Sequence, residues 1–159
     1  MSDGIEIKPI LGACGAEISG VDPSKPLGNE KFVAVHQAML DHQVIFFCDQ
    51  DLTPEQQVEF SRLFGELRIS EQYEWLEGYP EIIKIVKGPV ITGIVSNLWH
   101  SDESFLPQPA LGSLLYILES PEVGGDTMFA NQYFAYEARS PGMQEMLSGL
   151  NAVHSDASL

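Results

Sequence analysis

The chain of 159 residues is 44% hydrophobic and 19% charged, a composition typical of a globular domain with a buried core. Its 8 basic and 23 acidic residues give a net charge of −15, which argues against nucleic acid or an anionic membrane as a partner. The two cysteines have no metal-binding spacing, and neither a signal peptide nor a membrane-spanning run is evident. We therefore expect one domain covering residues 1–159, in a cytoplasmic protein.

Hydrophobic patterns in the first half of the chain predict alternating strands and helices. Alternation with a period of two predicts a short strand over 5–10, and apolar residues at helical spacing predict a helix over 30–42. Two short apolar runs, 44–47 and 81–86, are expected to be strands, the first of them buried.

The segment 52–67 carries several helix signals together. Thr53 can cap the N-terminus, Pro54 suits the first turn, and Gln56 can complete a capping box. Gly65 can end the helix. A helix starting just after Thr53 is therefore predicted.

The second half of the chain predicts mainly strands. Residues 111–119 are apolar enough for a central strand, and 120–131 are expected to form a turn that leads into another strand. Residues 87–97 are interpreted as a loop or loosely paired hairpin, and 132–150 as two helices broken before Pro141. Because strands should outnumber helices here, a β-rich barrel or jelly roll with helices packed outside is favoured.

The stretch "NLWHSDESF" (97–105) places an imidazole and a carboxylate, His100 and Asp102, two positions apart. The stretch otherwise has the pattern of a buried strand, on which these two side chains would share one face and converge on one point. Such donors suit a first-row transition metal, and two histidines with one carboxylate are the ligands of non-haem iron(II) oxygenases. Taken alone, the pair fits a histidine held by a neighbouring acid better than it fits a metal site.

A second motif, "GGDTMFAN" (124–131), follows downstream of the histidine and aspartate. Together the two motifs closely resemble the taurine dioxygenase family of iron(II)- and 2-oxoglutarate-dependent oxygenases, which includes phenoxyacetate and alkylsulfate dioxygenases. The resemblance also covers "GAEISGVD" (15–22), residues 42–67 and "LSGLNAVHS" (147–155), so it extends over essentially the whole chain. The resemblance implies that the chain corresponds to the N-terminal part of a family member.

This resemblance implies a double-stranded β-helix (a cupin-like jelly roll) of β-rich α+β class with flanking helices, incomplete at its C-terminus. It implies that His100 and Asp102 bind Fe(II), that Thr127 holds the distal carboxylate of 2-oxoglutarate, and that Asn97 lies near the cosubstrate. Dioxygen and a small organic substrate (a carboxylate, sulfonate, sulfate ester or aryl ether) would complete the reaction, which forms succinate and carbon dioxide.

The sequence departs from the family where the substrate is expected to bind. Sulfonate-binding members carry a histidine where this chain has Ser70, followed by a tyrosine that matches Tyr73. Without a cationic partner at Ser70, taurine is expected to be a poor substrate, and a carboxylate or aryl ether a better one. The resemblance also argues against His154 as the third iron ligand.

The chain ends before the family's distal iron-binding histidine and 2-oxoglutarate-binding arginine, and Arg139 matches no such site. Two alternatives to an active dioxygenase therefore stay open. One is a truncated, catalytically inactive fragment that binds or oligomerises, so that a homo-oligomer is possible. The other is an unrelated cupin-like metal protein.

Overall fold

The computed structural model describes residues 4–70, 73–86 and 99–155. They fall into two compact units, Met1–Glu66 with Tyr116–Gly149, and Leu67–Leu115 with Leu150–Leu159. The expectation of a single domain over 1–159 stays a prediction, and the predicted loop at 87–97 lies outside the described residues.

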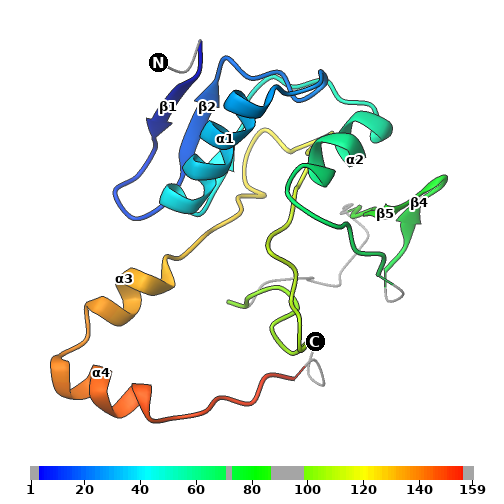
Figure 1. Ribbon diagram of the computed structural model, residues 1–159. Helices are drawn as coiled ribbons and strands as arrows, with labels where there is room; N and C mark the ends of the chain where they lie inside the picture. Colours follow the sequence, from blue (N-terminus) through cyan, green and yellow to red (C-terminus); the bar gives the residue numbers. More distant parts are fainter. Residues whose placement is uncertain (1–3, 71–72, 87–98, 156–159) are drawn as a thin grey trace. The chain divides into compact units, whose positions relative to one another are not determined.

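A three-stranded sheet and a crossing helix organise the first unit. Strands β1 (Glu6–Pro9) and β2 (Ala16–Ser19) pair antiparallel, and β3 (Ile45–Phe46) pairs with β2 in parallel. Because parallel neighbours need a long connection, helix α1 (Asn29–His42) supplies the crossover and lies against the sheet (Figure 1). The predicted first strand and first helix are thus confirmed. The predicted buried strand at 44–47 forms, but it is shorter and only partly buried.

The core of this unit lies between α1 and β2. Val35 is fully buried and Ala38, one helical turn later, is 2% exposed, so both belong to one face of α1. They pack with Ile18 and Val21, and partly buried apolar side chains surround the cluster: Ile5, Leu27, Ile45, Phe47 and Phe64. Burial of this face, rather than helix propensity alone, fixes α1 on the sheet.

Helix α2 (Pro54–Arg62) begins as predicted. The Thr53 side chain accepts a hydrogen bond from the Gln56 N–H (3.2 Å), and the Gln56 side chain accepts one from the Thr53 N–H (2.8 Å). This is the capping box that the sequence indicates. The helix ends at Arg62, before Gly65, whose φ of 150° lies beyond the helical region.

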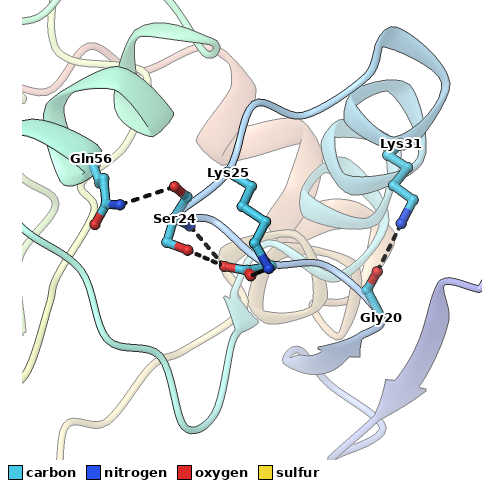
Figure 2. A network of polar contacts seen from close by, with 6 residues as sticks. Gly20, Ser24, Lys25, Lys31 and Gln56 are labelled. Carbon is cyan, nitrogen blue, oxygen red and sulfur yellow. Dashed lines mark hydrogen bonds and ion pairs between the residues drawn. The ribbon is translucent and has the colours of Figure 1, made fainter.

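The loop before α1 is tied to α2 by polar contacts (Figure 2). Asp22 accepts hydrogen bonds from the Ser24 backbone (3.0 Å) and hydroxyl (2.5 Å) and forms an ion pair with Lys25 at 2.6 Å. The hydrogen bond from Lys25, followed by that from Ser24, lowers the pKa of Asp22 to about 2. The Gln56 side-chain amide donates to the Ser24 carbonyl at 3.1 Å, so the residue that caps α2 also holds this loop.

Two side chains attach the later part of the first unit to its sheet. The Tyr116 hydroxyl accepts from the Leu52 N–H (3.1 Å) and donates to the Gln50 carbonyl (3.2 Å). The Asn131 amide donates to the Ala13 carbonyl (2.7 Å). The same Asn131 caps helix α3 with its side-chain oxygen.

The described residues after Ile83 form no strand, so the strands predicted at 111–119 and after the turn at 124–125 are wrong. The apolar side chains there are exposed, Leu118 to 81%, because no neighbouring strand among the described residues pairs with them. The predicted helix pair is confirmed as α3 (Gln132–Glu137) and α4 (Pro141–Ser148). The predominance of strands expected after residue 80 is therefore not observed.

In the second unit, β4 (Trp75–Leu76) and β5 (Tyr79–Ile83) form an antiparallel hairpin. Gly78 lies in its turn at φ 84°, a conformation that favours glycine. The strand predicted at 81–86 is thus confirmed in part, since it starts earlier and ends at Ile83. Among all described residues, no helix is long and apolar enough to cross a membrane.

Among the described glycines, Gly20 has the least room for a side chain, and its replacement should destabilise the fold. Its φ is 79°, and a Cβ there would lie 1.6 Å from the Gly4 carbonyl oxygen. We expect Gly20→Ala to lower the free energy of unfolding by about 2–4 kcal/mol, through backbone strain and overpacking. Denaturant unfolding would measure this. Gly12→Ala, where a Cβ meets nothing within 4 Å, is the matched control and should change stability by less than about 0.5 kcal/mol. Equal stability of the two variants would contradict the close approach.

Candidate metal centre

Of the two residues of the predicted metal site, Asp102 begins a turn and His100 lies two positions before it, and neither is in a strand. Residues 102–105 are turn, and Glu103 has a φ of 53°, in the left-handed region. The Leu106 N–H closes the turn on the Glu103 carbonyl at 2.9 Å. The predicted strand is wrong here, because a residue with positive φ interrupts an extended backbone.

The turn nevertheless brings His100 and Asp102 together. His100 Nε2 lies 3.2 Å from Asp102 Oδ1, and the two side chains are 38% and 58% exposed. Two ligands that meet a metal at right angles, each about 2.1 Å away, are about 3.0 Å apart. The observed separation therefore suits neighbouring positions in one coordination sphere. It equally suits an ion pair with a protonated histidine, which at this exposure stabilises by only about 0–1 kcal/mol.

The second oxygen of Asp102 is held by a hydroxyl. Ser113 Oγ donates a hydrogen bond to Asp102 Oδ2 at 2.9 Å. The two oxygens of the carboxylate therefore have different partners, since Oδ1 faces the imidazole and Oδ2 faces the serine. A hydrogen bond to one oxygen of a ligating carboxylate fixes its orientation.

Two further side chains hold the same turn. Arg68 Nη1 lies 2.9 Å from Glu103 Oε2, and His154 Nδ1 lies 2.8 Å from Ser104 Oγ. His154 therefore reaches the turn through Ser104. The described residues contain no group of three or more histidine, cysteine, aspartate or glutamate side chains arranged to hold a metal. In this part of the chain His100 and Asp102 are a pair of candidate donors, and their role as metal ligands stays a prediction.

The structure describes three of the other four predicted site residues and tests the role of none of them. Ser70 is partly buried and Tyr73 is 53% exposed, both in the second unit. Thr127 is exposed, outside any helix or strand, in the first unit. Asn97 lies outside the described residues. The roles of these four residues stay predictions.

Sequence reasoning missed the residues that support the turn. Ser113 had one weak signal, a hydroxyl within an otherwise apolar run, whereas Arg68 had none. Neither is a local neighbour of its partner, since Ser113 is 11 positions from Asp102 and Arg68 is 35 positions from Glu103. Contacts between residues so far apart depend on the tertiary structure, so no short sequence pattern indicates them.

Comparisons with a family model and with known proteins all point to one family of dioxygenases. The family model described as "Taurine catabolism dioxygenase TauD, TfdA family" matches residues 6–158. An alkylsulfatase from Acinetobacter baylyi is 33% identical over 96% of this chain and 47% of its own length. An alpha-ketoglutarate-dependent sulfate ester dioxygenase from Pseudomonas putida is 31% identical over 96% of this chain and 50% of its own length.

A solved structure extends the similarity to the fold. The crystal structure of a taurine dioxygenase from Burkholderia xenovorans matches with a TM-score of 0.76 and 30% identity, over 92% of this chain and 51% of that one. The chain thus spans about half the length of the curated relatives and of the solved structure that it matches.

If His100 and Asp102 share a metal, removal of either should weaken its binding. We expect His100→Ala and Asp102→Ala each to weaken Mn(II) binding, a stand-in for Fe(II), by more than about 100-fold, since loss of even a supporting residue costs about 10–100-fold. Electron paramagnetic resonance of free Mn(II) gives the affinity. Glu119→Ala removes an exposed acid elsewhere and is the control. If His100→Ala binds Mn(II) as tightly as the unaltered protein, the contact of His100 with Asp102 is an ion pair and not part of a metal site.

Proposed function

The chain belongs to the taurine catabolism dioxygenase TauD, TfdA family, and from this we propose that the protein is an iron(II)- and 2-oxoglutarate-dependent dioxygenase. The observation that carries the proposal is the 3.2 Å separation of His100 Nε2 and Asp102 Oδ1 within the family's motif. The reaction would convert 2-oxoglutarate, dioxygen and a C–H bond of the substrate into succinate, carbon dioxide and a hydroxylated product. Membership of this family argues against an unrelated cupin-like protein.

Each proposed role follows from the chemistry of the side chain. His100 and Asp102 would hold Fe(II) on neighbouring positions, and the bound iron would supply the activation of dioxygen. The Thr127 hydroxyl would donate to the distal carboxylate of 2-oxoglutarate, with Asn97 near the same cosubstrate. Ser70 and Tyr73 would contact the substrate.

We further propose that the chain is the N-terminal part of a double-stranded β-helix that forms one domain. Similarity over 92% of this chain to a solved structure of about twice its length supports this. The exposed apolar segment around Leu114 and Leu118 fits the same proposal. The part of the fold that the relatives have in addition would cover this segment and bury its exposed side chains.

The substrate is proposed to be a small organic anion, with a sulfate ester foremost. Two of the relatives are named for sulfate esters or alkyl sulfates, and both match 96% of this chain. Ser70 offers a neutral hydroxyl, which cannot form the ion pair that a protonated histidine can form, so taurine is expected to be a poorer substrate here than in members that carry the histidine. Hydroxylation of the carbon next to the ester oxygen would yield an unstable product that releases sulfate and an aldehyde.

The proposed activity is tested by succinate formation. We expect the protein, together with the part of the fold that its relatives have in addition, to form succinate and sulfate in equal amounts from a medium-chain alkyl sulfate when supplied with Fe(II), 2-oxoglutarate and dioxygen. Aryloxyacetates serve as the second substrate class, and taurine should be turned over least. Asp102→Ala should form no succinate above background. The same turnover without iron, or taurine as the best substrate, would contradict the proposal.

Residues 1–159 alone should form no succinate, because the described residues provide no third ligand.

The role of Thr127 is tested through the requirement for 2-oxoglutarate. Thr127→Val keeps the shape and removes the hydroxyl, so one hydrogen bond to a charged group is lost, about 1.5–3 kcal/mol. The KM for 2-oxoglutarate should rise by about 10- to 150-fold, measured by succinate formation. Thr127→Ser keeps the hydroxyl and should restore most of the affinity. A Thr127→Val protein with an unchanged KM would show that this threonine does not contact the cosubstrate.

A further inference from the structure

The carboxylate of Asp102 has its two oxygens in different surroundings. Oδ1 lies 3.2 Å from His100 Nε2, on the side where a shared metal would be coordinated. Oδ2 accepts the Ser113 hydroxyl at 2.9 Å. A carboxylate with both oxygens available can bind a metal through one or both, whereas one that has an oxygen engaged elsewhere favours binding through the other.

Ser113 differs from the other side chains that hold the turn. Three side chains from distant parts of the sequence contact three consecutive residues, since Ser113 reaches Asp102, Arg68 reaches Glu103 and His154 reaches Ser104. Arg68 and His154 contact residues that are not proposed ligands. Only the Ser113 hydroxyl, among these three, touches an atom of the proposed ligand pair.

We propose that Ser113 is a positioning residue that orients the Asp102 carboxylate, so that Oδ1 alone faces the metal. The inference rests on the proposed function, because it assumes that Asp102 is an iron ligand. With Oδ2 held by Ser113, Asp102 would hold the iron through Oδ1 alone, which would leave more coordination positions for 2-oxoglutarate and dioxygen than binding through both oxygens. Ser113 would therefore influence both the number of coordination positions left open on the iron and the affinity of the site for the metal.

The size of the effect follows from the exposure of the bond. A hydroxyl that donates to a carboxylate makes a charge-assisted hydrogen bond, stronger than a neutral one. Ser113 and Asp102 are both exposed, however, so water can replace part of the lost contact. Removal of a supporting residue typically weakens metal binding by about 10–100-fold, and we expect the lower end here, about tenfold.

The test compares three variants of the protein with the unaltered form. Ser113→Ala removes the hydroxyl, and Ser113→Thr retains a hydroxyl at the same position. Ser104→Ala removes a hydroxyl from the same turn that meets His154 and not a proposed ligand. Mn(II) affinity is measured by electron paramagnetic resonance. Infrared difference spectra of protein labelled with ¹³C-aspartate report, through the splitting of the carboxylate stretches, whether Asp102 binds through one oxygen or both.

The expected result separates positioning from general support of the turn. Ser113→Ala should bind Mn(II) about tenfold more weakly, with a smaller splitting of the carboxylate stretches, and Ser113→Thr should restore both values. Ser104→Ala should keep the splitting of the unaltered protein, whatever its affinity. A shift of the splitting in Ser104→Ala equal to that in Ser113→Ala would assign the effect to the turn as a whole and overturn the inference.

Failure of this inference is distinguishable from failure of the proposed function. If the unaltered protein binds Mn(II), loses it on Asp102→Ala, and keeps affinity and splitting in Ser113→Ala, Ser113 has no positioning role while the iron site stands. If Asp102→Ala binds Mn(II) as the unaltered protein does, Asp102 is not a ligand. Both the iron site as proposed and the role of Ser113 then fall.

Discussion

The packing of α1 across β2 is the interaction on which the first unit depends. The helix buries Val35 and Ala38 against Ile18, and this burial keeps the crossover between two parallel strands in place. The segments around Tyr116 and Asn131 join this unit through a few hydrogen bonds. The apolar core therefore fixes the N-terminal elements, and the later segments are positioned by hydrogen bonds that satisfy backbone groups one at a time.

The candidate metal centre is built differently. No buried apolar cluster involves the turn at 101–106, since the buried core residues of the described chain all belong to the first unit. The turn is held instead by a serine, an arginine and a histidine, and each contact is exposed to solvent. Exposed polar contacts of this kind stabilise weakly, so the ligand pair would gain rigidity chiefly from the metal and from the rest of the fold.

The accuracy of the sequence predictions follows the range of the interactions involved. The capping box at Thr53 and the break at Pro141 depend on neighbours within four residues, and both were predictable. A strand depends on a partner elsewhere, so the apolar composition of 111–119 could not decide whether it would be paired. The motif indicated His100 and Asp102, whereas the contact of Ser113 with Asp102 required the tertiary structure.

The pair of donors also shows why the motif can be recognised although its predicted local structure was wrong. On a strand, side chains two positions apart start about 6.6 Å from each other and must lean together to share a metal. In the turn, the positive φ of Glu103 lies directly after the aspartate, and the two donor atoms come within 3.2 Å. Coordination requires that the donor atoms be about 3 Å apart, and different backbone conformations can provide this separation. The spacing of histidine and aspartate therefore carries information on the ligands, and the strand was an additional assumption.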